Sequence, residues 1–413
     1  MNDKLYWDNA YKFEFEAKVI RIMDGLPLGV VLDGTYFFPQ GGGQPSDRGH
    51  LGSYQVIDVQ EVDGQIVHYL DNRSGVAANI ELGDDVKCKI DQDFRYQNMR
   101  SHTGAHVLFG AARKLFTTLG YAGFDIHGGG GSLYLRTDSP VTPKLMYRIL
   151  DYANSAIVDS YAIGTYFVKP EEVSKIRGCV YNVELPKDNA RIVEIEGWDI
   201  AVCSGTHLAH TIEIGPISII DREAHKKGVT RLDYVVARAA VSEIMLDEQA
   251  LGEVENILSS GRDRAAHEAE RLIRTLKDQQ KETSKLQELL AEYRINELLA
   301  KEEKLRNISI VVGTISDISQ EILRPLVARR LKRQKQQILA LVGNLGMTFI
   351  IAGHTDDVNI DLQKIVVDVA KIHGGSGGGS SHLMSAGGLK ANADVVRIEL
   401  FNQIQTEVNN GNN

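Results

Sequence analysis

Two pairs of residues in this 413-residue chain have the spacing of metal ligands. His102 and His106 stand four positions apart in RSHTGAHVLFGAA, where apolar residues recur with helical periodicity, so both imidazoles are expected on one helix face. Cys203 and His207 have the same spacing in CSGTH, and a helical turn or a tight glycine-containing turn would point the sulfur and the imidazole at one ion. Together the pairs predict a zinc (Zn2+) site with four protein ligands.

The number of ligands bears on what such a site does. Four protein ligands form the closed tetrahedral shell of structural zinc, whereas catalytic zinc usually keeps three and leaves one position open. Two interpretations remain open for catalysis: one ligand gives way to water when the substrate arrives, or the ion becomes five-coordinate. Peptide hydrolysis is not favoured, because Thr103 follows His102 where the HExxH metalloproteases carry their glutamate.

The composition is that of an ordinary globular protein, with 43% hydrophobic residues and a net charge of −9. This acidic balance gives no global sign of nucleic-acid binding, so any such contact needs a local basic patch. No apolar stretch is long enough for a membrane helix, and the charged N-terminus lacks a signal-peptide pattern. Three cysteines in so long a chain suit a reducing compartment. We therefore expect a cytoplasmic protein of several domains with no membrane contact.

An α+β scaffold is expected to hold the two ligand pairs. Residues 1–92 contain short β-branched runs separated by Gly, Asp and Asn, a pattern that predicts a small antiparallel β-barrel. The pattern becomes helical over Phe94–Leu119, with Gly120 as the stop residue, and strands and helices then alternate to about Ala239. Residues 93–239 are accordingly expected to form the zinc-binding α+β domain.

Two further regions follow the expected zinc-binding domain. Residues 240–306 lack proline, which favours a long helix or a helical hairpin of coiled-coil type. Its apolar residues follow a seven-residue spacing with its four-residue partner, interrupted at Gln279 and Thr283: Leu272, Leu276, Leu286, Leu290 and Tyr293. We expect this helical segment to mediate self-association, with packing on its own domain as the alternative. Residues 307–413 read as an α/β domain with a glycine-rich segment.

The segments around the ligands resemble the editing domain of alanyl-tRNA synthetase and its free-standing relatives, the AlaX proteins. The resemblance runs through RSHTGAHVLFGAA, LYLRTD, CSGTHLAHTIEIGPISIID and GVTRLDYVV, and includes LDGTYFFPQGGGQPSDRGHL nearer the N-terminus. KIHGGSGGGSSHLMSAGG resembles the glycine-rich motif of the domain that ends the synthetases and the long AlaX proteins. Upstream of these motifs we expect no room for the class II aminoacylation core and its ATP site, so the resemblance implies an editing protein that acts in trans.

The family resemblance implies hydrolysis of serine or glycine wrongly attached to tRNA specific for alanine. The enzyme is expected to be a cytoplasmic homodimer that needs no ATP and has this mischarged tRNA as its partner. The resemblance also implies that His102, His106, Cys203 and His207 are the metal ligands. A zinc-bound water is the expected nucleophile, with zinc positioning the substrate for attack by free water as the alternative; the sequence identifies no general base. Two other functions remain open: a zinc hydrolase of the threonyl-editing type, and a non-catalytic tRNA-binding protein with structural zinc.

Candidate substrate-pocket residues lie in two glycine-rich segments. Glycine permits close backbone approach and positive φ, so the amides of the first segment are expected to line the pocket, with a tight inter-strand loop as the alternative. The second segment carries an acidic residue and a histidine where relatives place Thr or Gln, and that histidine is equally well read as a solvated loop residue. The candidates are Gly41, Gly42, Gly43, Gln44, Asp125 and His127.

Candidate tRNA contacts lie in the last domain. A basic helical segment carries Arg324, Arg329, Arg330, Lys332, Arg333 and Lys335, which would contact phosphates unless they form a solvated face. The run that includes Gly377, Gly378 and Gly379 could form an anion-binding nest for a tRNA phosphate. Relatives often carry Arg-Pro after these glycines, where this chain has Ser-Ser-His.

Overall fold

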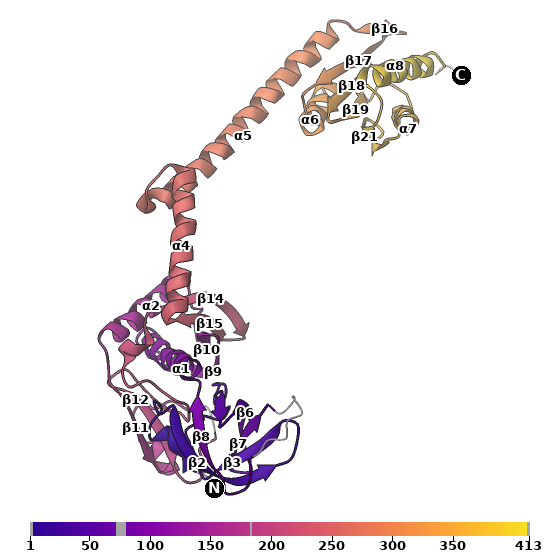
Figure 1. The fold of residues 1–413 in the computed structure, drawn as a ribbon. Helices are drawn as coiled ribbons and strands as arrows, with labels where there is room; N and C mark the ends of the chain where they lie inside the picture. Colours follow the sequence, from indigo (N-terminus) through magenta and orange to yellow (C-terminus); the bar gives the residue numbers. More distant parts are fainter. Residues whose placement is uncertain (1–2, 72–79, 182–183, 411–413) are drawn as a thin grey trace. The chain divides into compact units, whose positions relative to one another are not determined.

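The computed structural model describes residues 3–71, 80–181 and 184–410. The protein is a mixed α+β chain that divides into two compact units, residues 1–254 and 255–413 (Figure 1). This division is coarser than the four regions expected from the sequence, whose boundaries remain predictions. Within the described residues, no helix is both long enough and apolar enough to span a bilayer.

The first unit begins with a closed six-stranded barrel, in the order β2-β3-β7-β6-β5-β8. Alternation of polar and apolar residues builds it: in β8, DVKCKI, every second side chain is buried. The three-residue strand β5 was not expected from the sequence, because it is too short to show a pattern. The barrel strands are β2 (Glu14–Met23), β3 (Leu28–Leu32), β5 (Gly49–Leu51), β6 (Tyr54–Val62), β7 (Gln65–Leu70) and β8 (Asp85–Ile90), with β1 (Asp3–Lys4), η1 (Leu5–Trp7) and β4 (Gly34–Thr35) beside them.

A long helix, α1 (Gln92–Arg113), follows the barrel and lies in the core of the next region. The Asp91 side chain caps its N-terminus by accepting a hydrogen bond from Phe94 N (3.1 Å). The expected helix end at Gly120 is wrong: the helix ends at Arg113, and β9 begins at Leu119. The apolar pattern continued past the helix because Leu119 packs against the same core from a strand.

Two sheets complete the first unit. The first is four-stranded and antiparallel, with order β14-β15-β10-β9, and packs on α1 and α2. The second is three-stranded, with order β11-β12-β13, and its last strand leads into CSGTH. The elements are β9 (Leu119–His127), β10 (Gly130–Thr137), α2 (Pro143–Val158), β11 (Ile163–Val168), α3 (Pro170–Val173), β12 (Ala190–Ile195), β13 (Asp199–Val202), η2 (Thr211–Ile214), β14 (Ile217–Lys226) and β15 (Val229–Val236).

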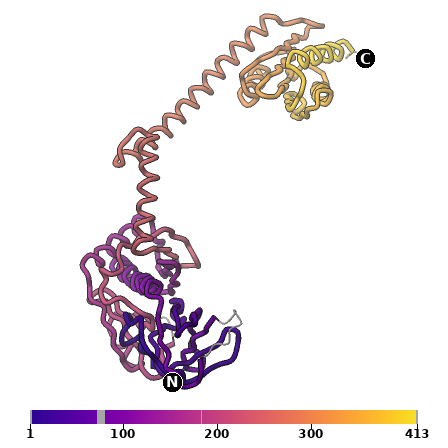
Figure 2. Tube along the Cα trace, in the orientation of Figure 1, coloured from indigo at the N-terminus to yellow at the C-terminus, as the bar shows by residue number. Residues whose placement is uncertain are grey.

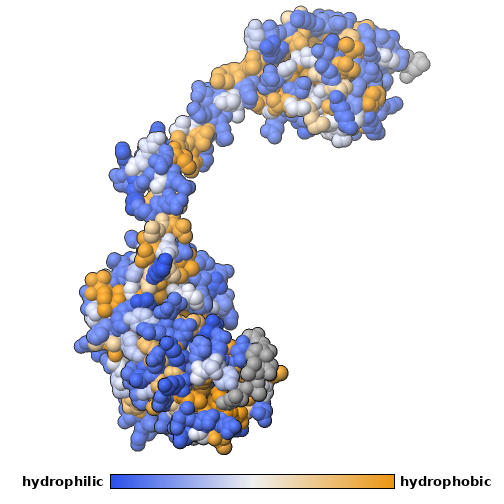
Figure 3. All heavy atoms as spheres, viewed as in Figure 1, coloured by the Kyte–Doolittle hydropathy of each residue, from blue (hydrophilic) through white to orange (hydrophobic). Residues whose placement is uncertain are grey.

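The expected helical region consists of two helices, α4 (Ala237–Leu258) and α5 (Arg262–Leu299), separated at residues 259–261. Both carry exposed apolar side chains, visible as orange spheres among blue ones along these helices in Figure 3. On α5 they include the residues of the seven-residue pattern: Leu272, Leu276, Leu286, Leu290 and Tyr293. The C-terminal end of α5 packs through Ala291 and Ile295 on the sheet of the second unit.

The second unit is built on a six-stranded mixed sheet of order β16-β17-β18-β19-β21-β20. The path of the chain through this unit can be followed in Figure 2 by the change from orange to yellow. Residues 303–305, expected in the helical segment, instead form β16 and pair with β17. The elements are β16 (Glu303–Leu305), β17 (Ile308–Ser316), α6 (Gln320–Leu331), β18 (Gln337–Leu345), β19 (Met347–His354), α7 (Leu362–Ile372), β20 (Ser376–Ser380), β21 (Leu383–Leu389) and α8 (Ala393–Asn410).

Candidate metal centre and its pocket

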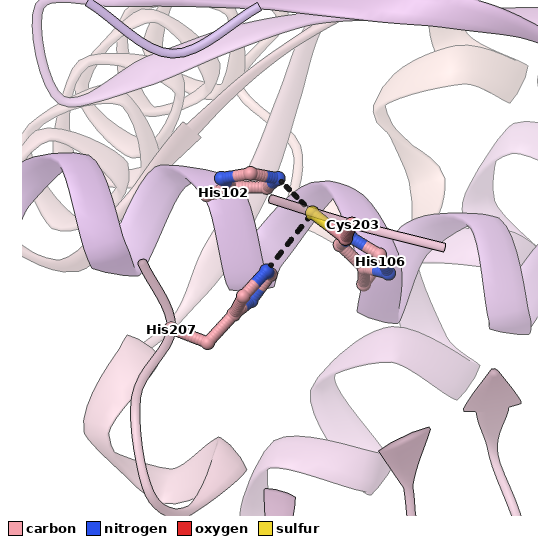
Figure 4. Close-up of side chains that lie close together, drawn as sticks. All are labelled: His102, His106, Cys203 and His207. Carbon is pink, nitrogen blue, oxygen red and sulfur yellow. Dashed lines mark hydrogen bonds between the residues drawn. The ribbon is translucent and has the colours of Figure 1, made fainter. Parts of the chain in front are cut away.

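The four predicted ligands meet in the first unit (Figure 4). His102 and His106 lie on one face of α1, and Cys203 and His207 lie in the loop that follows β13. One ligand atom from each residue can be chosen so that all four lie within 4.8 Å of one another. The three histidines are buried, and Cys203 as a whole residue is partly exposed.

Each of the three imidazoles uses its Nδ1 atom for a contact outside the cluster. The Nε2 atoms of His102 and His207 lie 3.2 and 3.3 Å from Cys203 Sγ. The Nε2 atom of His106 is buried and has no hydrogen-bond partner. The Nδ1 contacts are Gln44 Oε1 for His102 (2.8 Å), Asp199 Oδ2 for His106 (2.8 Å) and Thr103 Oγ1 for His207 (3.3 Å).

These donors fit a bound metal ion. Tetrahedral bonds of about 2.0–2.3 Å place ligand atoms about 3.3–3.7 Å apart, close to the spacing of Cys203 Sγ from the two nitrogens. A ligating histidine normally engages its second ring nitrogen with a carboxylate or another polar group, which fixes the ring. An ion would also satisfy the otherwise unpaired His106 Nε2. The cluster can therefore bind a metal ion.

The electrostatics of the cluster favour ligating forms at two positions. Burial opposes ionisation of the Cys203 thiol, but the adjacent His102 and His207 hold its pKa well below the usual value. Burial lowers the pKa of His207 to about 3, which keeps its imidazole neutral. Burial also opposes protonation of His106, but the hydrogen bond to Asp199 raises its pKa to about 10. Metal binding must therefore displace a proton from His106.

Side chains from distant segments hold the ligand loop, which has no regular structure of its own. Arg191 Nη1 donates to the carbonyl oxygens of Cys203 and Gly205, both at 2.9 Å. Trp7 Nε1 donates to the Ser204 carbonyl oxygen at 2.9 Å. These contacts satisfy backbone groups that would otherwise be unpaired beside the cluster, and so restrict where the loop can lie.

The glycine run forms a tight turn, as the alternative interpretation from the sequence proposed. The backbones of Gly41 and Gln44 exchange hydrogen bonds of 3.1 and 3.0 Å. Gly42 and Gly43 between them have φ of 57° and 80°, as a two-residue turn of type I′ requires. The turn delivers the Gln44 side chain into the protein, where it is 1% exposed. The side chain of Gln44, rather than its backbone N–H, therefore reaches the metal cluster.

A pocket of about 410 Å³ adjoins the cluster, and His106 and Cys203 are among its lining residues. Aromatic rings contribute much of its wall: Trp7, Phe109, Tyr121, Phe124 and Tyr181. Its polar lining includes Arg191, Asp199 and Asn189, and Gly42 is the residue of the glycine turn that reaches it. A ligand in this pocket would therefore reach the metal centre from the side of Cys203.

The other pocket candidates lie elsewhere. Asp125 and His127 are exposed residues of β9, which forms a hairpin with β10, so His127 is not the loop residue of the alternative interpretation. Asp125 lines a second hollow together with Gly41, Gly43 and Gln44, and His127 lies 3.5 Å from Ser132 Oγ. Neither Asp125 nor His127 is among the described residues that line the pocket at the metal cluster.

The basic candidates of the second unit fall into two groups. Arg329 is paired with Glu288 (2.9 Å) and Glu292 (3.6 Å) of α5, and Arg330 is bonded to Asn296 (3.4 Å). These two arginines therefore brace α6 against α5. The remaining members are exposed: Arg324, Lys332, Arg333 and Lys335.

The C-terminal glycines do not form the expected nest. Gly377, Gly378 and Gly379 lie in β20, an edge strand that pairs with β21 and is exposed along its length. The glycine run favoured an anion-binding nest in the sequence, but glycine within a strand also marks a site where another backbone approaches closely. The Ala386 side chain lies 2.8 Å from where a Cβ of Gly377 would stand.

Sequence reasoning missed the residues that support the ligands: Thr103, Arg191 and Asp199, and the side-chain role of Gln44. Asp199 carried a weak signal, because an acidic residue shortly before a predicted ligand loop is a common partner for a metal-binding histidine. Arg191 and Gln44 carried none, since their contacts span 12 and 58 residues of sequence.

Comparisons with known proteins locate two matching families in the first unit. Residues 190–233 match the family described as threonyl and alanyl tRNA synthetase second additional domain. Residues 9–94 match the family described as tRNA synthetases class II (A). The first match includes Cys203 and His207, and the second includes Gln44.

Whole-chain similarity extends further. The alanine–tRNA ligase of Pyrococcus abyssi is 32% identical over 382 residues, which cover 91% of this chain and 40% of the ligase. The alanine–tRNA ligase of Sulfurisphaera tokodaii is 30% identical over 99% of this chain and 44% of its own length. This chain thus spans about two fifths of these relatives. The crystal structure of the C-Ala domain from Aquifex aeolicus alanyl-tRNA synthetase matches with 21% identity and a TM-score of 0.23, covering 25% of this chain and 96% of that one.

Proposed function

Taking as the premise that this chain belongs to the alanyl-tRNA synthetase-related family, we propose that it is a zinc-dependent deacylase acting in trans on mischarged tRNA specific for alanine. The reaction adds water across the ester that joins the amino acid to the terminal ribose, and releases a free amino acid and an uncharged tRNA. The observation that carries the proposal is the cluster of His102, His106, Cys203 and His207. Two of its members, His106 and Cys203, line the 410 Å³ pocket.

Zinc is the metal that this donor set suits. Three imidazoles and one thiolate form a typical zinc shell, whereas calcium and magnesium require oxygen ligands. When bound, zinc supplies a Lewis acid that polarises a carbonyl and lowers the pKa of water to about 7. The protein's own residues orient the ring nitrogens, hold the CSGTH loop and line the substrate pocket.

The pocket suits a terminal nucleoside that carries an amino acid. Its volume lies within the range of about 300–1,000 Å³ found for small-molecule sites. Aromatic rings such as Trp7 and Tyr181 offer faces on which a base can stack, and Arg191 and Asn189 offer hydrogen-bond donors. The metal-ligand residues His106 and Cys203 would then face the ester.

Editing of serine has a physical rationale. Serine exceeds alanine by one hydroxyl group, and a small apolar synthetic pocket rejects such an analogue by only about 100-fold. A second site that hydrogen-bonds the hydroxyl discriminates in the opposite direction, because alanine leaves its polar groups unpaired. We propose seryl-tRNA as the main substrate, with glycyl-tRNA as a second; the side chain that makes this choice is not assigned.

A second candidate function is favoured by one observation. The structure offers four protein donors, the number found at structural zinc sites rather than at most catalytic ones. The protein would then bind tRNA without cleaving the ester. A preference for a different aminoacyl ester, such as seryl-tRNA specific for threonine, would instead indicate a relative of the threonyl-editing enzymes.

The test is release of labelled amino acid from seryl-, glycyl- and alanyl-tRNA specific for alanine, with purified protein before and after chelation. We expect hydrolysis of the seryl or glycyl ester that is lost on chelation, restored by zinc, and absent for alanyl-tRNA. The variant His102→Ala should lower the rate to that of the uncatalysed reaction and lower the bound zinc. Binding of all three tRNAs without hydrolysis would favour structural zinc.

The proposal extends to partners and location. We propose that exposed Lys332, Arg333 and Lys335 contact tRNA phosphates, with the backbone of β20 as a second contact. Exposed apolar side chains on α5, such as Leu286 and Leu290, support a homodimer. Free cysteines support a reducing, cytoplasmic location.

A further inference from the structure

The Gln44 side chain connects the glycine turn to both parts of the metal cluster. Its Oε1 atom accepts from His102 Nδ1 on α1 (2.8 Å) and from Thr206 N in the CSGTH loop (3.1 Å). Its Nε2 atom donates to Thr206 Oγ1 (2.8 Å). Because Gln44 is 1% exposed and these contacts are buried, water cannot replace them without rearrangement.

These contacts determine which way the amide faces. The Thr206 backbone N–H can only donate, so the atom it contacts must be the oxygen of Gln44. The same oxygen faces His102, and His102 Nδ1 must therefore carry a hydrogen and donate it. The neutral ring then has its lone pair on Nε2, the nitrogen that lies 3.2 Å from Cys203 Sγ.

We infer that Gln44 is a positioning residue for the metal centre, which selects the tautomer of His102 that can ligate and fixes the CSGTH loop against α1. This inference rests on the proposed metal-dependent function. It assigns the glycine turn a role beyond lining the pocket, because the turn directs Gln44 inward. A supporting contact of this kind typically changes metal affinity by about 10–100-fold when it is removed.

If Gln44 had only a structural role, it would act through packing and through its contacts with Thr206. Two substitutions separate this role from that of the hydrogen-bond acceptor to His102. Gln44→Met keeps the length of the side chain but removes both the acceptor and the donor. Gln44→Glu also removes the donor to Thr206, yet it keeps an oxygen that can accept from His102, as Asp199 does for His106. A difference between the two variants therefore reports on the acceptor to His102.

The experiment is titration of metal-free full-length protein with Co2+, followed by its visible absorption, and competition of Zn2+ with a chelator. We expect Gln44→Met to weaken metal binding about 10–100-fold and Gln44→Glu to stay within a few-fold of wild type. Gln40→Met is the matched control, because exposed Gln40 contacts Gln60 (3.1 Å) near the same turn and should leave affinity unchanged. Urea unfolding of the metal-free proteins shows whether each variant is folded.

The outcomes separate this inference from the proposed function. If wild-type protein binds the metal and Gln44→Met binds it equally well, or if the Glu and Met variants lose affinity equally, the positioning role is overturned alone. If wild-type protein has no measurable affinity for either metal, the metal-dependent function falls and the inference falls with it. Should Gln44→Met not fold, Thr206→Val provides the test: it removes the acceptor that orients the amide, and a loss of about 3–10-fold is expected.

Discussion

Gly205 occupies the narrowest point of the metal centre. A Cβ atom at this position would overlap the His102 ring and would stand 2.8 Å from Gln44 Oε1. Glycine is therefore required at the third position of CSGTH for steric reasons, whereas Ser204 beside it is exposed. The CSGTH motif thus combines two candidate ligands, Cys203 and His207, with a glycine between them that is small enough to lie against His102 of α1.

Substitution of this glycine should break the centre. We expect Gly205→Ala to displace His102 or the loop and to weaken metal binding by about 100-fold or more, measured by Co2+ titration. Gly164→Ala is the control, because a Cβ at Gly164 would meet no atom within 4 Å and its φ is not positive. Retention of wild-type affinity in Gly205→Ala would show that the loop approaches α1 less closely than described.

The four residues of the cluster were predictable from sequence and the residues that contact them were not, for a physical reason. Two ligands four residues apart are a local pattern, because one helix turn or one loop brings them together. The pairing of His102 with Gln44, or of His106 with Asp199, depends on how separate segments meet in the folded protein. The tautomer of each histidine follows from those distant contacts, so it cannot be predicted from a single sequence.

At the scale of elements, Glu213 fastens the segment that follows the ligand loop. Its carboxylate accepts from Tyr11 Oη (2.9 Å) and from Tyr96 Oη (2.8 Å) on α1. It also accepts from the backbone N–H groups of Ala209 (3.2 Å) and His210 (3.0 Å). Partial burial alone would raise the pKa of Glu213, but these hydrogen bonds hold it below the usual value.

A pH dependence follows from the lowered pKa of Glu213. A depressed folded-state pKa contributes stability that is present above the unfolded-state pKa of about 4.3 and is lost as pH falls through the folded-state value. We expect Glu213→Gln to be less stable than wild type by about 1 kcal/mol at pH 7, with the difference narrowing below about pH 4. Urea unfolding of both proteins from pH 7 to pH 3 checks this; a difference that grows on acidification would contradict it.

The elements themselves were predicted unevenly. Long patterns such as the strands β17, β18 and β19 were recognised, since buried β-branched runs bounded by glycine are distinctive. The end of α1 was placed too late because Leu119 keeps the apolar period after the helix has stopped. β16 was assigned to the helical region because three residues show no period at all, and pairing with β17 is what defines it.

At the scale of the whole molecule, the tRNA contacts proposed for the second unit depend on basic side chains that are not paired with acidic side chains of the protein. Arg329 is paired with two glutamates of α5, so we expect it to contribute little to the counterion release that accompanies tRNA binding. We expect Lys332→Ala with Arg333→Ala to weaken tRNA binding and to reduce the slope of log affinity against log salt by about 1–2. The slope of log affinity against log salt can be measured by fluorescence anisotropy. Roughly 50 to 200 mM salt is the range over which phosphate contacts change the affinity strongly.

The matched variant is Arg329→Ala, which should change the slope less than the double variant does. If Arg329→Ala and the double variant reduced the slope equally, Lys332 and Arg333 would contribute no more to tRNA binding than Arg329 does. The sequence predicted this basic segment, but only the structure separates Arg329 and Arg330, which contact α5, from the other basic residues.

The metal centre joins residues that are far apart along the chain: His102 and Cys203 are separated by 101 positions, and Gln44 and Thr206 by 162. A bound ion would therefore act as a long-range cross-link between these segments, which is lost when the chain unfolds. By mass action, free metal at a hundredfold excess over its dissociation constant adds about 2.7 kcal/mol to the free energy of unfolding. The population that proteases and chaperones encounter unfolded falls by about two orders of magnitude in consequence. The amount of this protein in a cell should accordingly follow the metal supply, even where its substrate is absent.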